Sequence, residues 1–433
     1  MASASYLRGE WPLLAALAAG VLGFVLEHAA VQAGGAALWG LFALVLLAVI
    51  GVAFRIAHHA EVLAVRLGEP YGTLILTVSA VSVEVVILVG MLMDSHSPTL
   101  ARDTVFAAVM LDINGILGIA AIIGGLRHGS QKYNTGSANS YLAMLLTALG
   151  LGMFIPDFVS DAHWPAYSAF SVAIMALLYV AFLRLQTVAH RAAFEHGKLE
   201  HEAHDLAGSP NWAHAGVLIG AVVAVGLLSE ILSVLLGAGL EGSGLPLTIP
   251  AVMVALISAS PEFMAAINAA RHDRMQTTVN IALGASLATV LLTLPVIEGI
   301  ALFTGERIIM ALTPIQAGML LVTLLVSMNN LHDGESNAIE GMSHFALFAG
   351  FVAMTGPARA LNTVGGQVAW QSAALGAVLG GLNPRRRLPH LTYALIPLAI
   401  TFVAVVVLRS SHFLGGSEGI FVQRARDPLS FRF

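Results

Sequence analysis

Two glutamates lie deep inside long apolar stretches of this sequence, and their carboxyl groups are its most conspicuous chemistry. Glu84 closes the run ILTVSAVSVE and Glu262 closes the run MVALISASPE, each with a serine two residues earlier. An ionised carboxylate at the centre of a bilayer costs roughly 2.5–3.5 kcal/mol by insertion measurements, so an acid there is a functional hypothesis by default. The competing interpretation is a protonated, hydrogen-bonded glutamate with a structural role only. Two such acids at matching places favour a pair of groups that bind cations and protons.

Pro261 predicts an interrupted helix directly before Glu262. Proline has no N–H and cannot bond the carbonyl of Ile257, so that carbonyl is free to face a cation. Ca²⁺ takes six to eight oxygen ligands, from carboxylates, carbonyls and waters. We predict Ser82 and Ser260 as further ligands, which requires broken helices, because residues two apart on a regular helix point to different sides. A hydroxyl bond to the carbonyl four residues earlier competes with this interpretation for each serine.

Polar side chains also follow each glutamate stretch. Ser286, Thr289 and Thr293 have the spacing of one polar stripe on an otherwise apolar helix. The run LDINGILG offers Asp112 and Asn114. We predict that Asn114 and Ser286 help to ligate the cation, while small and hydroxyl side chains are also common devices of helix packing in membranes.

The composition requires a membrane around these residues. The chain of 433 residues is 57% hydrophobic and 10% charged, whereas a soluble domain carries about 25% charged residues. The mean hydropathy is +0.83. Apolar stretches of about 18–25 residues, each long enough to cross the bilayer as a helix, recur along the chain. With no cysteine, disulfides, thiolate nucleophiles and zinc–sulfur sites are excluded.

The predicted fold is an all-α polytopic membrane protein with about eleven transmembrane helices. It has one extra N-terminal helix, two inverted five-helix repeats, and room for one or two more spans at the C-terminus. The predicted spans are Trp11–Gln32, Ala36–Arg55, Pro70–Met93, Asp103–Leu126, Ala138–Ile155, Pro165–Arg184, Trp212–Leu236, Pro246–Ala270, Thr277–Leu302, Pro314–Met328 and Met342–Met354. Arg and Lys concentrate in the loops on the same side of the membrane as the N-terminus. Up to Thr355, the loops on the other side contain only Arg102 and Arg307. Because cytoplasmic loops are enriched in Arg and Lys, this pattern predicts a cytoplasmic N-terminus.

A polar linker divides the chain into two halves. The expected parts are the extra helix 11–32, a first repeat 36–184, a linker 185–211, a second repeat 212–357 and an appended region 358–433. Five is an odd number, so two five-helix units joined in sequence must have opposite orientations, as in transporters with inverted repeats.

The linker contains acids and histidines that could bind metal or tune activity with pH. Its candidate regulatory residues are Glu195, His196, Glu200, His201, Glu202, His204 and Asp205. A solvated linker is the alternative. His201 and His204 are three residues apart rather than four, so this is not a metalloprotease signature.

Several motifs together resemble the cation/proton exchanger family of the calcium/cation antiporter superfamily, in its bacterial branch that also handles sodium and potassium. The resemblance covers about Arg55 to Pro357. It is carried by Gly68-Glu69-Pro70-Tyr71-Gly72-Thr73, Gly124-Gly125-Leu126-Arg127-His128, Gln131-Lys132-Tyr133-Asn134, Ser260-Pro261-Glu262, Gly284-Ala285-Ser286-Leu287, Asp333-Gly334-Glu335-Ser336-Asn337 and Glu340-Gly341.

The resemblance implies a secondary antiporter that exchanges Ca²⁺, or Na⁺ or K⁺, for protons, with Glu84 and Glu262 as alternating cation and proton sites. It implies no cofactor beyond the transported ions, a lipid bilayer as partner, no nucleic acid, and the inner membrane of a bacterium. Val81 stands where the broader family has an asparagine three residues before its first glutamate, so the preferred cation stays open.

Rival functions have weaker support in the sequence. A monovalent-cation/proton antiporter fits the same scaffold. An intramembrane hydrolase lacks a recognisable nucleophile motif, because neither H-E-x-x-H nor G-x-S-x-G nor any cysteine occurs. A channel usually builds its filter from repeated rings in an oligomer rather than from two glutamate helices in one chain.

Overall fold

A computed structural model of the chain describes residues 10–68, 71–95, 97–189, 194, 210–240 and 248–355. The described part is helical apart from one short strand pair, which confirms the all-α fold class. The helices are α2 (Trp11–Ala33), α3 (Gly35–Leu67), α4 (Tyr71–Ser95), α5 (Leu100–Met110), α6 (Leu117–His128), α7 (Thr135–Leu149), α8 (Trp164–Arg184), α10 (Asn211–Leu240), α11 (Thr248–Ser258), α12 (Ser260–Arg271), α13 (Met275–Ala288), α14 (Leu294–Thr304), α15 (Pro314–Asn330) and α16 (Ala338–Thr355). Shorter segments are the π-helices η1 (Leu111–Ile116), η2 (Gly150–Phe154), η4 (Leu185–Ala189) and η5 (Thr289–Thr293), the 3₁₀-helix η3 (Ile155–Phe158), and the strands β1 (Gln131–Lys132) and β2 (Glu335–Ser336).

Fewer helices than predicted have the full length of a membrane span. Among the described residues, eight helical runs are long and apolar enough to cross a membrane, and the bent pair α11–α12 makes a ninth. Helices α15 and α16 occupy the places of the tenth and eleventh predicted spans. At 17 residues, α15 is about 25 Å long, somewhat short of a hydrocarbon core of about 30 Å.

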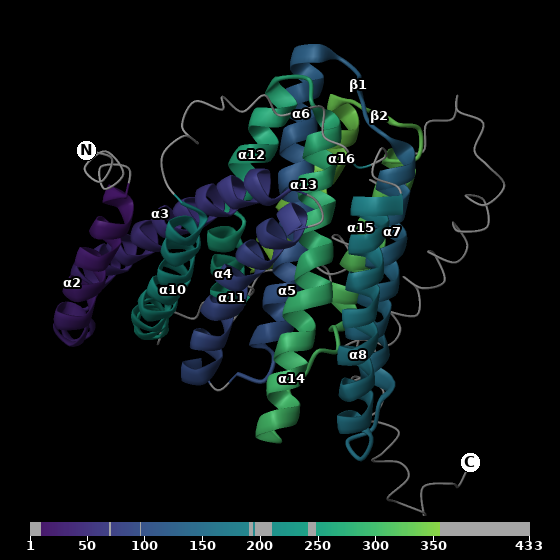
Figure 1. The fold of residues 1–433 in the computed structure, drawn as a ribbon. Helices are drawn as coiled ribbons and strands as arrows, with labels where there is room; N and C mark the ends of the chain where they lie inside the picture. Colours follow the sequence, from purple (N-terminus) through teal and green to yellow (C-terminus); the bar gives the residue numbers. More distant parts are fainter. Residues whose placement is uncertain are drawn as a thin grey trace, which may run out of the picture.

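The two halves of the chain run in opposite directions through the molecule. In Figure 1, α5 lies below α6, which continues it through η1, whereas α13 lies above α14, which continues it through η5. The third helix of each predicted repeat therefore crosses the molecule with opposite polarity, as an inverted repeat requires.

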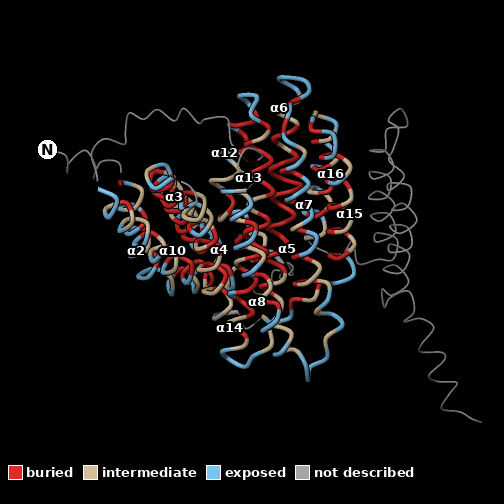
Figure 2. Tube along the Cα trace, turned by 45° about the vertical axis from the view of Figure 1, so that its right-hand side comes forward, coloured by how far each residue is buried: buried red, intermediate tan, exposed pale blue. Residues whose placement is uncertain are grey.

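The burial pattern separates an inner layer from an outer one. In the apolar 18-residue window of each run, 83% of the residues are buried in Leu100–His128 and 61% in Met275–Thr304, against 22% in Trp11–Ala33 and 17% in Trp164–Val188. Figure 2 shows buried residues concentrated around α13, with many exposed positions along α2. The exposed side chains of α2 include Phe24 and Val25, which suits contact with lipid rather than water. The two inner runs are therefore the ones that can enclose a polar site.

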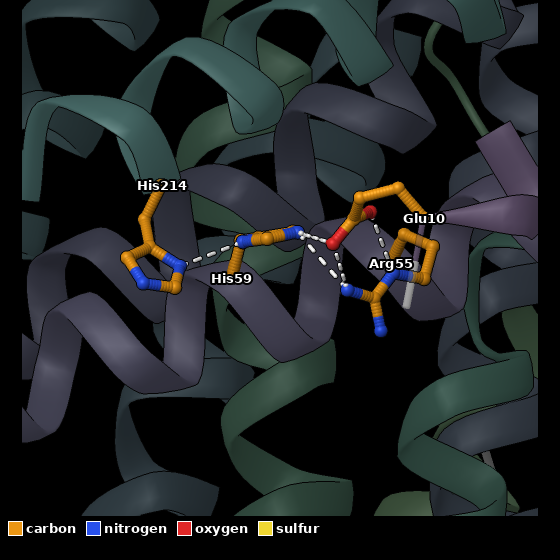
Figure 3. A network of polar contacts seen from close by, with 4 residues as sticks. All are labelled: Glu10, Arg55, His59 and His214. Atoms are coloured by element: carbon orange, nitrogen blue, oxygen red, sulfur yellow. Dashed lines mark hydrogen bonds and ion pairs between the residues drawn. The ribbon is translucent and has the colours of Figure 1, made fainter. Parts of the chain in front are cut away.

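A buried polar network fastens the start of α2 to α3 and α10. Glu10 accepts a hydrogen bond from Arg55 Nε at 3.1 Å and contacts His59, whose Nδ1 lies 2.8 Å from Nδ1 of His214 (Figure 3). One histidine of that pair must donate and the other accept. Burial of Glu10 raises its pKa, but the hydrogen bond and charge of Arg55 and His59 outweigh burial, so the pKa of Glu10 lies below its usual value. The extra helix thus joins the first helix of both predicted repeats.

Glycines bring α6 and α16 into close contact on the other side of the molecule. A Cβ at Gly341 would lie 2.6 Å from the backbone nitrogen of Ile122, so only glycine fits there. The antiparallel pairing of β1 with β2 ties together the segments that lead into α7 and α16. These contacts fix α6 as a rigid support for η1.

Candidate functional site

Glu84 is held in the interior by two threonines of the other half. It lies in the middle of α4 and is 4% exposed. Its Oε2 accepts hydrogen bonds from the hydroxyls of Thr289 at 2.8 Å and Thr293 at 3.1 Å, both on η5. Among the described residues, its Oε1 has no hydrogen-bond partner. One oxygen is therefore anchored, and the other is available to a ligand.

Glu262 sits at a break between two helices, as Pro261 predicts. α11 and α12 meet at an angle of 53°, and Pro261 occupies the first turn of α12. Glu262 lies in that same turn, where the helix dipole and free N–H groups favour a negative charge. Its Oε2 is buried and has no hydrogen-bond partner among the described residues. The break therefore presents a second carboxylate with an uncommitted oxygen.

Asp112 is a third acid of the site, although the sequence-based prediction of cation ligands did not include it. It lies on η1, is 2% exposed, and accepts a hydrogen bond from Ser286 of α13 at 3.1 Å. It is near enough for the charges of Glu262 and Glu84 to act on it. The rule that singles out an acid inside an apolar span applies to Asp112 as well, so the signal was present in the sequence.

The two π-helices carry these contacts. η1 presents Asp112 and η5 presents Thr289 and Thr293, and each interrupts one of the two most buried spans. A π-helix is an α-helix with a local change of register and is frequent at functional sites. η1 contacts α12 and α13, and η5 contacts α4 and α5. Each π-helix therefore turns polar side chains of one half toward the glutamate helix of the other.

A central cavity of about 720 Å³ gives access to the three acids. Glu84, Asp112 and Glu262 all line it. Farther along, its walls include Glu61 of α3 and Arg274 after α12, which belong to the helix ends where Arg and Lys concentrate. The cavity thus has the volume to hold a hydrated cation, and it connects the three acids with those helix ends.

Ser82 and Ser260 are not brought to this cavity. Ser82 Oγ donates to the carbonyl of Val78 and Ser260 Oγ to that of Leu256, both at 2.6 Å, and neither serine lines the cavity. Each hydroxyl bonds the carbonyl four residues earlier, the competing interpretation raised by the sequence. The bend lies at Ala259, before both Ser260 and Pro261. It does not turn the Ser260 hydroxyl into the cavity. Their prediction as ligands therefore lacks support in this conformation.

Asn114 and Ser286 act at different distances from the cavity. Asn114 is fully buried, donates to Thr323 of α15 at 2.8 Å and lies 3.0 Å from Nδ1 of His344 on α16. It faces away from the central cavity and packs η1 against α15 and α16. Ser286 is also buried and reaches the site through Asp112. Neither lines the cavity directly, so direct ligation by these two side chains also lacks support here.

The predicted regulatory residues Glu195 to Asp205 lie outside the described residues, as does the appended region 358–433. Phe194, directly before Glu195, is described. Phe194 is 5% exposed and packs edge-on against Tyr141 and Phe182, and its carbonyl accepts a hydrogen bond from Asn280 at 3.0 Å. Tyr141, Phe182 and Asn280 line the central cavity, so the linker reaches the cavity wall at Phe194.

Comparison with known proteins identifies the family. The family model of the sodium/calcium exchanger protein matches residues 37–188 and 212–356, one segment in each half and more than half of the chain. The chain is 34% identical over 314 residues to y4hA of Sinorhizobium fredii, which is named as an ionic transporter, with 70% of this chain and 85% of that protein covered. It is 31% identical over 334 residues to the sodium-potassium/proton antiporter ChaA of Escherichia coli, and the match covers 73% of this chain and 91% of that protein. The Ca²⁺/H⁺ antiporter ChaA of Bacillus subtilis is 26% identical over 318 residues, and the match covers 71% of this chain and 89% of that protein.

Solved structures share the fold. The structure of native YfkE has a TM-score of 0.62 with this chain at 23% identity, covering 79% of this chain and 98% of YfkE. The H⁺/Ca²⁺ exchanger CAX has a TM-score of 0.58 at 16% identity, covering 92% and 98%. The chain is therefore a multi-pass membrane protein of the sodium/calcium exchanger family, a cation antiporter of the calcium/cation antiporter superfamily and not an enzyme.

Proposed function

We propose that this protein exchanges Ca²⁺ for protons, with Glu84, Asp112 and Glu262 as the groups that bind either the cation or protons. The observation that carries the proposal is that three carboxylates, from α4, η1 and α12, line one central cavity. Three acids together repel one another unless a cation or protons neutralise them. Ca²⁺ prefers several oxygen ligands, and carboxylates are the strongest of these in proteins.

The coupling follows from the cost of burying charge. With Glu84 and Glu262 ionised, the site carries two negative charges, to which Asp112 adds a third, and it suits a divalent cation. With the carboxyls protonated, the site is neutral and can reorient without metal. The empty, ionised site cannot reorient cheaply, because moving unpaired charges through an apolar barrier is expensive. The cation therefore leaves one side only as protons enter from the other.

Exchange of Na⁺ or K⁺ for protons is a second candidate. It is favoured by the 31% identity with a relative named for sodium-potassium/proton antiport, which exceeds the 26% identity with a relative named for Ca²⁺/H⁺ antiport. The same acids could serve it, since one ionised carboxylate suffices to balance a monovalent ion.

Ion-by-ion transport separates the two candidates. Proteoliposomes with an imposed pH gradient receive Ca²⁺, Na⁺ or K⁺ in turn, and an internal pH dye reports the collapse of the gradient. We expect the largest response to Ca²⁺, with Glu84→Gln and Glu262→Gln inactive and Asp112→Asn strongly impaired. Glu306→Gln is the matched control, because Glu306 is an exposed acid outside the cavity. A wild-type rate in folded Glu84→Gln or Glu262→Gln would refute the site, and a response to Na⁺ and K⁺ alone would refute Ca²⁺ as the substrate.

We further propose a bacterial inner membrane as the location, with the N-terminus and the linker in the cytoplasm. Arg66, Arg127 and Arg271 lie in the last turns of α3, α6 and α12, which supports this orientation. Since the chain has no cysteine, single cysteines can report sidedness. Exposed Ser130→Cys should react with an impermeant thiol reagent from the cytoplasmic side, and exposed Ser160→Cys only from the other.

The linker remains a regulatory proposal. Histidine titrates near pH ~6.5, so His196, His201 and His204 can change the charge of an acidic segment in the physiological range. Glutamine at all three should shift the pH dependence of exchange while the maximal rate stays. Loss of all transport in a folded variant would instead put the linker in the ion path.

A further inference from the structure

Glu298 is a buried acid that the exchange site leaves unused. It lies on α14 and is 4% exposed, and among the described residues its Oε2 has no hydrogen-bond partner. Ser171 of α8 offers it a hydroxyl. It follows Thr293, a partner of Glu84, by five residues, which is about 7–8 Å along a helix. Glu298 therefore lies between the central acids and the end of the molecule where α14 stops.

A small cavity adjoins Glu298 on that side. It is separate from the central cavity and has a volume of about 30 Å³, which is enough space for water. The charged or titratable residues bordering it, within the described chain, are Glu298, Tyr167 and Arg307. Tyr167 donates its hydroxyl to the carbonyl of Leu151, and Arg307 pairs with Asp161. Neither of these groups neutralises Glu298.

The stretch between Glu298 and the central acids is closed in this conformation. Thr293, Leu294 and Ile297, which precede Glu298 on η5 and α14, are all fully buried. An ionised carboxylate in such a place has no counter-charge, so its burial is costly. A proton is the smallest group that removes this cost. A metal cation fits less well, because Glu298 is the one carboxylate that borders this cavity within the described chain.

We propose that Glu298 is a proton-binding site separate from the central acids, which loads from the side where α14 ends and passes its proton toward Glu84 when the cavity opens to that side. On loading, a hydronium ion gives its proton to Oε2 and leaves as water. On transfer, the O–H bond at Glu298 breaks as one forms on the Glu84 carboxylate, with water as relay. The inference rests on the proposed proton-coupled exchange and adds to it a group outside the cation site.

The test varies the pH on the α14 side alone. Right-side-out and everted vesicles allow this while the pH and the cation on the cavity side stay fixed. Glu298→Gln keeps the volume and hydrogen bonding but cannot titrate, so exchange should slow about tenfold or more and lose most of its dependence on the α14-side pH. The apparent KM for the cation on the cavity side should be unchanged. Glu306→Gln, an exposed acid eight residues farther along the chain, should behave as wild type.

Three outcomes would overturn the proposal: a wild-type response to the α14-side pH, an altered cation KM, or failure of Glu298→Asp to restore any pH dependence. A direct proton count keeps the test valid if Glu298→Gln transports poorly for structural reasons. In detergent, an alkaline jump followed with an indicator dye should release one proton fewer from the variant than from wild type. Equal counts would refute proton binding at Glu298. If wild-type exchange is itself independent of pH on both sides, the proposed function fails instead, and the proton count still decides the role of Glu298.

Discussion

The hydroxyls of Thr289 and Thr293 offer the sharpest test of how the site favours an ionised Glu84. Both donate to the same oxygen, at 2.8 and 3.1 Å, and all three side chains are buried, with Glu84 and Thr289 at the wall of the central cavity. Thr→Val keeps the shape of each side chain and removes only the donor. The carboxylate then loses part of the stabilisation of its charged form, and protons compete better against the cation.

The size of the effect can be worked from these contacts. A hydrogen bond to a charged group contributes about 1.5–3 kcal/mol, and about 1.4 kcal/mol changes an equilibrium constant tenfold. We expect Thr289→Val to raise the apparent KM for the cation about tenfold or more at a fixed pH, and Thr293→Val to raise it less because its bond is longer. The double variant should show less than the sum of the two free-energy changes, since both hydroxyls share one acceptor.

The assay is initial-rate exchange in proteoliposomes over a range of cation concentrations. Thr147→Val is the matched control, because the Thr147 hydroxyl is exposed on α7 and bonds the carbonyl of Ala143 in its own helix. Melting temperatures of all variants show whether the fold is kept. An unchanged or lower KM in Thr289→Val would mean that the hydroxyl does not favour the charged carboxylate, and the reasoning would be wrong.

Three further predictions follow from other contacts. Ser286→Ala should raise the cation KM about tenfold by removing the donor to Asp112, and an unchanged KM in transport assays would contradict this. Pro261→Ala restores an N–H that can continue the helix across the 53° bend, so exchange should fall while the melting temperature holds or rises; wild-type exchange would show that the bend is dispensable. The lowered pKa of Glu10 means that its contacts stabilise the fold above the usual pKa of about 4.5 and that this stability is lost as the pH falls through the lower, folded value. The melting temperature of wild type should therefore drop more steeply on acidification below that pH than that of Glu10→Gln, and parallel curves would count against the network.

The sequence predicts the two glutamates and the break because their causes are local. An acid in an apolar stretch needs a function whatever surrounds it, and Pro261 lacks its N–H in any fold. The partners of Glu84 are different. The stripe of Ser286, Thr289 and Thr293 is visible in the sequence, but its contact with α4 depends on how two distant spans pack. Which oxygen a hydroxyl meets is a property of that packing and not of the spacing.

The π-helices place polar side chains in ways that the sequence pattern does not predict. A π-helix shifts the register of a span by part of a turn, and no residue type marks it reliably. In η1, Asp112 accepts from Ser286 of α13, whereas Asn114 contacts Thr323 of α15 and His344 of α16. Residues two apart on a helix point to different sides, but which neighbouring helix lies on each side depends on the packing. Ser82 lies within α4 and Ser260 directly follows the bend at Ala259, yet each hydroxyl bonds the carbonyl four residues earlier. This local backbone bond forms both in continuous helix and across the bend.

The two glutamates match in sequence but have unequal surroundings, and this difference bears on coupling. Glu84 lies inside a continuous helix and faces neutral hydroxyls. Glu262 lies at the start of a helix, and its buried Oε2 has no hydrogen-bond partner among the described residues. The two threonine hydroxyls stabilise an ionised Glu84, whereas Asp112 and Glu262 repel each other until a cation or protons neutralise them, so metal and protons compete for that pair. Because both ligands neutralise the same pair, neither can leave alone without exposing two buried like charges. This asymmetry thus opposes uncoupled leak of either ion. We expect Asp112→Asn to loosen the coupling between cation and proton flux more than it lowers the cation flux itself. Simultaneous measurement of both fluxes in proteoliposomes tests this.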